Sequence, residues 1–397
     1  MTVRTLQRCL PETAFAWIDR WSPLTATAAL DSHAAVGQRL ARAVLADSDE
    51  PSAALAALDG FAVLAAETEG ASDYSPLPLT LARTGPLNPG AAMPVRSGEP
   101  LPVGADAVLS LELADVAGKS LEVAGGVAPG DGVIQAGDEF RVGEALLPAG
   151  HRLRIQDLGW LALAGVDRVA VHRRPRVRVV LAGGYSREVD GELLGALVGR
   201  DGGELKGLDM APDTGTLTTT FARPDADLLL VAGGSGLGDN DHVARLLAEH
   251  GILAHHGVAI HPGDGAMLGQ LGETPVVGLP GAPLGCVCAY DLLGCRLLRR
   301  LAGREPLWPY RGERLPLSRK IASRLGRLEV CRVRVVAGQV EPVAVSEGRL
   351  FRTLARADGV VLVPVQSEGY PAGSEVVVYG FDEATVMSST QRYDPHG

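Results

Sequence analysis

Continuous apolar segments that end in glycines, alternating with helical segments, are the feature that most constrains this fold. The strand-like segments are RVRVVLAGG (176–184), ADLLLVAGGSGLGD (226–239) and TPVVGLPG (274–281). The helical ones are DHVARLLAEHG (241–251) and LGCVCAYDLLGCRLLRRLAG (284–303). Strands without polar alternation, separated by helices, indicate a parallel sheet covered on both faces. We therefore predict a central α/β domain over residues 175–308 with a parallel or mixed sheet.

The remaining sequence predicts further domains, because 397 residues exceed one ordinary hydrophobic core. Short apolar runs between Gly and Pro turns predict a β-rich insert over 51–134. Residues 1–50 and 135–174 are predicted to form a helical linking domain, since HAAVGQRLARAVLAD (33–47) has apolar residues at helical spacing. A return to short strands predicts a small C-terminal β-barrel over 309–385, before a polar tail at 386–397. The fold class is multidomain α/β.

Charge and hydropathy exclude several classes of protein. A net charge of −10 argues against a nucleic-acid partner, and we interpret the basic residues around Pro175 as a solvated linker and strand edge. The N-terminus lacks the apolar segment of a signal peptide, and no apolar run approaches the roughly 20 residues that span a bilayer. We expect a cytoplasmic protein without a membrane partner. Three cysteines, Cys286, Cys288 and Cys295, lie in a predicted buried helix, where cysteine packs as a small apolar residue.

Two strand ends carry the strongest chemical signal. LAGGYSRE (181–188) and AGGSGLGDND (232–241) follow predicted parallel strands, and ligands bind beyond the carboxyl ends of such strands. Glycines allow close backbone approach to a ligand, and a following helix N-terminus offers free N–H groups to an anion. Asp239 and Asp241 are placed to hold Mg²⁺ or a polar ligand, although either could simply cap the helix. Spacing alone leaves these alternatives open.

Further motifs, taken in order, carry a resemblance along nearly the whole chain. They are ALDGFAV (57–63), RSGEPLPVGADAV (96–108), GEALLPAGHRL (143–153), GGSGLGDND (233–241), HPGDG (261–265) and LPGAP (279–283). Their joint order resembles the molybdopterin molybdotransferase family, of the MoeA and gephyrin E-domain type. The resemblance implies a four-part subunit whose α/β domain binds molybdopterin, and it implies a homodimer.

The resemblance also implies an activity. The family hydrolyses adenylylated molybdopterin with Mg²⁺, releases AMP and inserts molybdate, and the finished cofactor passes to client molybdoenzymes. By motif, the implied catalytic residues are Asp59, Ser97, Asp239 and Asp241, the last two also as metal ligands. The implied cofactor-binding residues are Gly183, Gly184, Gly233, Gly234, Ser235, Gly238, His261, Pro262, Gly263, Pro280 and Gly281. For Asp59 and Ser97, an ordinary turn role remains the alternative.

Departures from the family pattern are concentrated in the same segments. Gly184 and Tyr185 replace the acids of TGDEL, and Gly236 replaces the serine of GGxSxG. His261 and Asp264 replace the lysines of KPGKP, and Ala282 replaces the asparagine of LPGNP. Lysines are fixed cations suited to oxyanions, whereas a histidine is only partly protonated at pH 7 and an aspartate reverses the sign. Each lost contact of this kind costs about 2–4 kcal/mol of transition-state stabilisation.

The sequence therefore supports three hypotheses. The chain is an enzyme of molybdenum cofactor assembly, a degenerate paralogue that carries molybdopterin or the finished cofactor, or a structural partner subunit. We favour the enzyme, and leave open whether Glu188 or His261 has taken over a lost catalytic role.

Overall fold

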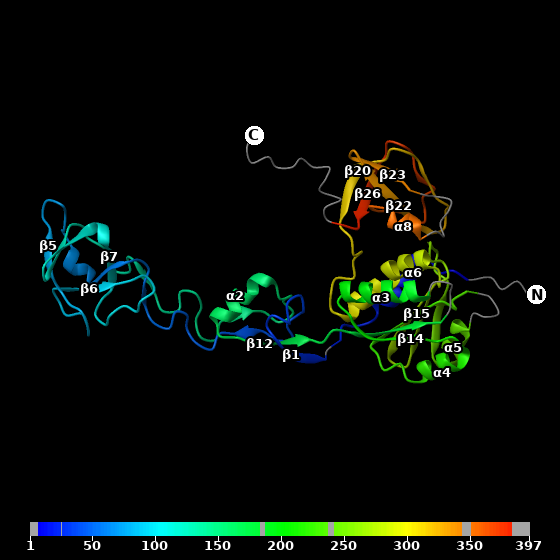
Figure 1. Cartoon of the computed structure of the whole chain (residues 1–397), viewed down its shortest axis with the longest axis horizontal. Coiled ribbons are helices and arrows are strands. Elements are labelled where there is room, and N and C mark those ends of the chain that lie inside the picture. The colour runs from blue at the N-terminus through cyan, green and yellow to red at the C-terminus, as the bar shows by residue number, and fades with distance from the viewer. Residues whose placement is uncertain (1–6, 25, 183–186, 237–241, 344–350, 383–397) are drawn as a thin grey trace, which may run out of the picture. The chain divides into compact units, whose positions relative to one another are not determined.

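The computed structural model describes residues 7–24, 26–182, 187–236, 242–343 and 351–382. The chain divides into two compact units, drawn in Figure 1. Residues 1–26 and 173–397 form one, here called the α/β unit, and residues 27–172 form the inserted unit.

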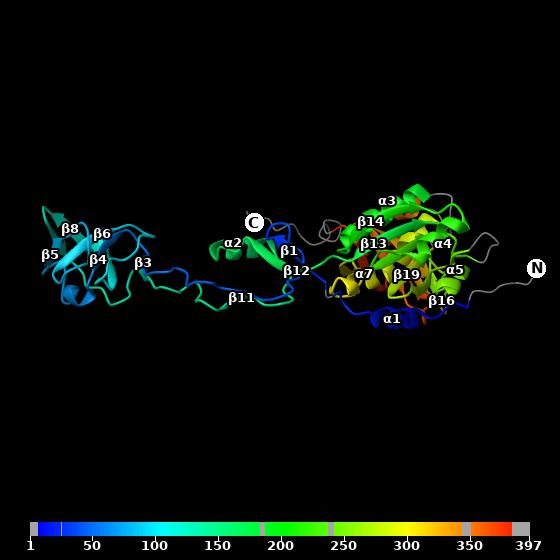
Figure 2. The same ribbon diagram turned by 90° about the horizontal axis from the view of Figure 1, so that it is seen from below.

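A six-stranded mixed sheet forms the centre of the α/β unit, and Figure 2 shows several of its strands. Its order is β14 (Glu204–Met210), β13 (Arg176–Leu181), β15 (Leu228–Ala232), β19 (Thr274–Leu279), β18 (Met267–Leu271) and β16 (Ile252–His256). The first four strands are parallel, β18 runs antiparallel to β19, and β16 runs antiparallel to β18. All five residues of β15 are buried, as expected for a central strand covered on both faces.

Helices cover both faces of this sheet (Figure 1). One face packs against α1 (Pro11–Asp19), α3 (Arg187–Arg200), α6 (Pro283–Ala289), the π-helical turn η3 (Tyr290–Gly294) and α7 (Cys295–Leu301). The other packs against α4 (Thr214–Ala222) and α5 (Val243–His250). The position of α1 corrects the predicted linking domain, because Trp17 and Ile18 lie in the core of the α/β unit.

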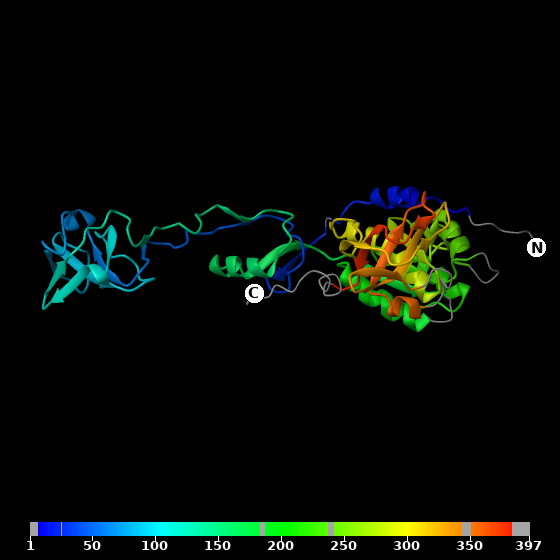
Figure 3. The same cartoon turned by 90° about the horizontal axis from the view of Figure 1, so that it is seen from above.

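The C-terminal strands form a sheet attached to the α/β core, shown from orange to red in Figure 3. Its order is β17 (Ile260–His261), β22 (Leu328–Val336), β24 (Gly359–Val363), β26 (Glu375–Gly380) and β20 (Gly312–Pro316), with β23 (Gln339–Pro342) paired to β22. The short elements β21 (Ile321–Ala322), β25 (Gly369–Tyr370) and α8 (Arg352–Ala355) complete it. Leu317, directly after β20, bridges Val340 of β23, and the Ser318 amide donates to the Val340 carbonyl at 2.9 Å. The sheet therefore curls back on itself, which agrees with the predicted barrel-like shape of this region.

The inserted unit contains the predicted β-rich segment. Six strands pair in the order β7 (Ala107–Ser110), β4 (Gly60–Val63), β6 (Ala91–Val95), β5 (Leu77–Leu81), β9 (Ser120–Val123) and β8 (Ala114–Ala117). The 3₁₀ turns η1 (Ala65–Thr68) and η2 (Leu111–Leu113) and the pair β3 (Leu55–Ala56) with β10 (Val133–Ile134) accompany this sheet.

The linking part of the inserted unit is less helical than predicted. It consists of β1 (Thr27–Asp31), β12 (Arg168–His172), β2 (Val44–Leu45), β11 (Ala145–Leu147) and α2 (Ile155–Leu163). The helix expected at 33–47 is wrong: the chain turns after β1 and makes isolated bridges from Arg39 to Arg152 and from Leu40 to Val171. The apolar spacing there serves a small core shared with α2 and β12.

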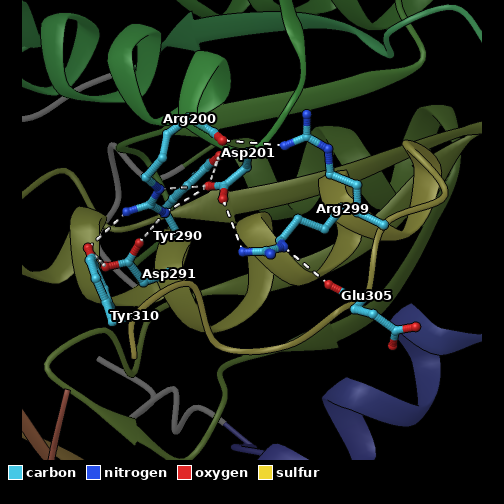
Figure 4. A network of polar contacts seen from close by, with 8 residues as sticks. Arg200, Asp201, Tyr290, Asp291, Arg299, Glu305 and Tyr310 are labelled. Atoms are coloured by element: carbon cyan, nitrogen blue, oxygen red, sulfur yellow. Dashed lines mark hydrogen bonds and ion pairs between the residues drawn. The ribbon is translucent and has the colours of Figure 1, made fainter. Parts of the chain in front are cut away.

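A buried polar network joins α3, η3 and the segment that leads to the C-terminal sheet (Figure 4). Arg200 Nη2 donates to Asp201 Oδ2 and to Asp291 Oδ1, each at 2.7 Å. The Tyr310 hydroxyl donates to Asp291 Oδ2 at 2.9 Å, and the Tyr290 hydroxyl donates to Asp201 Oδ2 at 3.1 Å. Because both carboxylates are almost fully buried, this network makes their burial tolerable.

Candidate functional site

The ends of the central strands place two predicted glycine-rich segments beside each other. The Gly233 amide donates to the Leu279 carbonyl at 2.9 Å, which joins the end of β15 to the end of β19. Gly233, Gly234 and Ser235 follow the first strand, and Pro280 and Gly281 follow the second. Both segments therefore lie at the carboxyl edge of the sheet, where an open α/β sheet binds ligands.

The HPGDG turn reaches the same edge. A Cβ built on Gly265 would lie 3.6 Å from the Ser235 hydroxyl oxygen, and one built on Gly285 would lie 3.3 Å from Pro280 Cβ and 3.8 Å from the Gly263 amide nitrogen. The structure thus brings together the GGS, HPG and LPG segments that the sequence analysis selected. Ser235 is 4% exposed, and its carbonyl accepts a hydrogen bond from His256 Nε2 at 3.1 Å.

A cluster of charges from the C-terminal sheet surrounds His261. Strand β17 places His261 opposite Glu329 of β22, and Glu329 accepts from Arg327 Nη2 at 2.8 Å. Burial lowers the pKa of His261, and the nearby Arg327 charge acts in the same direction. His261 is therefore mainly neutral near pH 7 and does not reproduce a fixed cation.

Arg332, which sequence reasoning missed, supplies a buried positive charge in this cluster. Its residue is 2% exposed, and among the described residues the one hydrogen bond of its guanidinium runs from Nη1 to the Val330 carbonyl at 2.6 Å. Its Nε is buried without a partner. Arg332 lies two residues after Val330 on β22, and Val330 packs in the core of the α/β unit, so both side chains lie on the face of the strand that meets this core. A buried guanidinium stays charged and favours a nearby anion. The sequence signal was only an arginine within an apolar strand.

Asp190, in the first turn of α3, is a buried carboxyl group, and neither of its oxygens has a hydrogen-bond partner among the described residues. The residue is 0% exposed, and burial raises its pKa to about 6. Gly191 beside it packs against Leu181 at the end of β13, and the Asp190 charge acts on Cys286 of α6. Asp190 thus lies next to two of the elements that build the site and titrates near neutral pH.

Asp59 and Ser97, the predicted catalytic pair of the inserted unit, contact each other. The Ser97 amide donates to Asp59 Oδ1 at 2.8 Å, and the Ser97 hydroxyl donates to the Ala57 carbonyl at 3.2 Å. This geometry brings the DGF and RSG motifs together. Their catalytic role stays a prediction, because these bonds also serve an ordinary turn.

Several predicted site residues lie outside the described residues. They are Gly183, Gly184, Gly238, Asp239 and Asp241. Among the residues that the structure does describe, no group of three or more His, Cys, Asp or Glu side chains is placed to hold a metal ion. In the same part of the chain, none of the helices has the length and apolar character needed to cross a membrane.

The comparisons first define the class of protein. Residues 178–300 match the family model described as a probable molybdopterin binding domain. Residues 7–165 match the MoeA N-terminal region, domains I and II, and residues 314–381 match the MoeA C-terminal region, domain IV. Along the chain, these three matches follow one another and cover almost all of it. The chain therefore belongs to the MoeA family.

Individual relatives agree with this assignment. The chain is 28% identical to molybdopterin molybdenumtransferase 1 of Mycobacterium tuberculosis, over 87% of this chain and 92% of that protein. It is 27% identical to the molybdopterin molybdenumtransferase of Nostoc, over 71% of each. Among solved structures, the molybdopterin biosynthesis moeA protein from Pyrococcus horikosii has a TM-score of 0.80 at 27% identity, covering 95% of this chain and 100% of that one.

Proposed function

We propose that this chain catalyses a step of molybdenum cofactor biosynthesis: hydrolysis of adenylylated molybdopterin with release of AMP, and insertion of molybdate into molybdopterin. Family membership supports the pathway, since relatives covering most of the chain are named molybdopterin molybdenumtransferases. The carrier and structural alternatives are not favoured, because no comparison points to either.

The observation that carries the proposal is the meeting of three glycine turns at the carboxyl edge of the sheet. Gly265 approaches Ser235, and Gly285 approaches both Pro280 and Gly263. Gly265 is half-buried and Gly285 is buried, so the absence of side chains at these glycines lets the three turns meet closely and form a surface of backbone groups. Such a surface suits a flat, polar molecule such as molybdopterin, whose binding needs shape and hydrogen bonds.

Two groups are candidates for the roles of the replaced family residues. Arg332 provides a fixed cation close to His261, where the family has lysine, and attracts the oxyanions of the substrates. Asp190 provides a carboxyl group with a pKa of about 6, close to the end of β13, where the family has acids. A carboxyl group that titrates near pH 6 can accept or donate a proton during hydrolysis.

The proposed reaction uses Mg²⁺, and the residues proposed to hold this ion lie outside the described residues. Mg²⁺ would neutralise phosphate charge in the substrate. Asp239 and Asp241 are the residues we propose to hold it. We further propose a cytoplasmic homodimer that passes the finished cofactor to a client molybdoenzyme.

The test follows AMP release and metal insertion by the purified chain with adenylylated molybdopterin, Mg²⁺ and molybdate. We expect both products. Tight binding of molybdopterin without AMP release would support the carrier alternative, and neither binding nor release would support the structural one.

A pair of glycine variants tests whether the meeting of the three glycine turns forms the binding site. Gly265→Ala places a methyl group beside Ser235, in the proposed site, and we expect roughly tenfold weaker binding of molybdopterin. Gly199→Ala is the control, because a Cβ there has no neighbour within 4 Å. Equal affinities of the two variants would contradict the position of the site.

A further inference from the structure

A cavity lined by three arginines lies in the C-terminal sheet. Its volume is about 560 Å³, and its walls include Arg319, Arg334 and Arg356 together with Glu341 and Asp358. This volume falls within the range of small-molecule sites, roughly 300–1,000 Å³. Every charged lining residue comes from the C-terminal region, so the cavity is separate from the glycine turns at the edge of the α/β sheet.

Hydrogen bonds fix the frame of this cavity. Arg319 Nη2 donates to the Pro342 carbonyl at 3.0 Å, which holds the turn after β20 against the end of β23. Asp358 Oδ2 accepts from the Val335 amide at 2.9 Å, and the Asp358 amide donates to the Val333 carbonyl at 2.9 Å. The walls therefore come from segments whose relative positions do not depend on a ligand.

Within this frame no carboxylate of the described residues pairs with Arg334 or Arg356. Arg334 and Glu341 lie opposite each other in the β22–β23 ladder, yet they form no ion pair, and Asp358 is occupied by a backbone amide. Among the described residues, neither Arg334 nor Arg356 has a carboxylate partner for its guanidinium. Among the described lining residues, three cations against two carboxylates leave an excess of one positive charge, in a chain whose net charge is −10.

We infer that this cavity binds a small organic phosphate monoester. Planar guanidinium groups match the geometry of phosphate oxygens and bind them with charge-assisted hydrogen bonds. The volume exceeds what a phosphate group alone fills, and Glu341 at the wall can accept hydrogen bonds from hydroxyl groups of the ester. The inference does not rest on the proposed enzymatic activity.

Calorimetric titration of the full chain with ribose 5-phosphate, AMP and inorganic phosphate tests it. We expect at least one of the two esters to bind more tightly than inorganic phosphate, with an affinity that falls as salt is added. Arg334→Gln and Arg356→Gln should each weaken that binding about tenfold. Arg324→Gln, an exposed arginine of the same region outside the cavity, is the matched control and should bind as the parent chain does.

Each outcome decides the inference. Tighter binding of AMP than of ribose 5-phosphate would support the ester site and add a base-binding portion, and the reverse order would support a site for sugar phosphates. If inorganic phosphate bound as tightly as both esters, the inference that the cavity binds a phosphate monoester would be overturned. Binding that survives in the Arg334→Gln/Arg356→Gln double variant would place the ligand elsewhere, and no binding by any of the three compounds would remove the site. Circular dichroism checks that the variants, all at exposed positions, keep the fold.

Discussion

Asp190 lies in an environment that does not favour its ionised form. A buried ionised carboxylate without a hydrogen-bond donor costs several kcal/mol, so such groups are normally paired or protonated. In the part of the chain that the structure describes, neither Asp190 oxygen has a hydrogen-bond partner, and burial raises the pKa of Asp190 from 3.8 to about 6. The folded chain therefore binds this proton more tightly than the unfolded chain does. Stability attributable to Asp190 is present below pH 4 and is lost as the pH rises through 6.

Asp190→Asn should remove this loss. The neutral amide resembles the protonated acid. We therefore expect the free energy of unfolding of the variant to exceed that of the parent by on the order of 2–3 kcal/mol at pH 7.5, and to equal it at pH 4. Urea titrations at these two pH values measure the difference. Asp291, whose pKa is also raised to about 6, is common to both proteins and cancels. A difference that does not change with pH would contradict the assignment.

Two glycines of the inserted unit test backbone packing. A Cβ on Gly60 would lie 2.1 Å from the Leu109 carbonyl oxygen in the neighbouring strand, whereas a Cβ on Gly159, in the middle of α2, has no neighbour within 4 Å. We expect Gly60→Ala to lower the free energy of unfolding by about 2–4 kcal/mol, since one strand must move. Gly159→Ala should raise it by about 0.5–1 kcal/mol. Thermal unfolding of both variants checks the opposite signs.

At the scale of elements, the sequence predicted best where the structure depends on local pattern. The strands at 176–181 and 228–232 were predictable, because strands covered on both faces are continuous apolar runs ended by glycine. The helix at 33–47 was not, because Ala35 and Leu40 pack against residues more than 100 positions away, and period alone cannot reveal such partners.

The candidate site, too, could be predicted from the sequence only in part. Its glycine turns were found from motif order, but Arg332 was missed. Nothing in CRVRV distinguishes an arginine that faces the α/β core from Arg334, two positions on, which faces solvent. The pairing of β17 with β22 joins segments far apart in sequence and sets His261 opposite Glu329, three residues before Arg332.

The network of Figure 4 makes the end of α3 sensitive to one substitution. Arg200→Met would leave Asp291, 5% exposed, without its cation, and would leave Asp201, 1% exposed, with only the longer contact to Arg299 Nη1 at 3.6 Å. Removing one partner of a buried ion pair costs about 3–5 kcal/mol, so we expect a loss of this size in urea unfolding. Arg245→Met removes the exposed ion pair with Glu249 within α5 and should cost under about 1 kcal/mol. Adding Asp291→Asn to Arg200→Met should recover part of the loss; no recovery would mean that the network does not carry the effect.

At the scale of the molecule, the hydrophobic cores keep to the two units. The clusters around Val177, Val180 and Leu315 contain residues of the α/β unit alone. Those around Phe61 and Leu40 contain residues of the inserted unit alone. Since each unit buries its own apolar residues, each has what it needs to fold independently.

Removal of the inserted unit tests this independence and separates binding from catalysis. The Arg173 amide donates to the Ala26 carbonyl at 2.8 Å, so the chain leaves and re-enters the α/β unit at one place. A linker of about four Gly and Ser residues in place of residues 27–172 should therefore close the unit without strain. We expect the shortened protein to fold cooperatively and to bind molybdopterin through the glycine turns, but to release no AMP, because Asp59 and Ser97 are gone. Circular dichroism, molybdopterin titration and the AMP assay measure the three properties. AMP release by the shortened chain would show that Asp59 and Ser97 are not catalytic, whereas a folded chain that fails to bind molybdopterin would show that the α/β unit alone does not form the site.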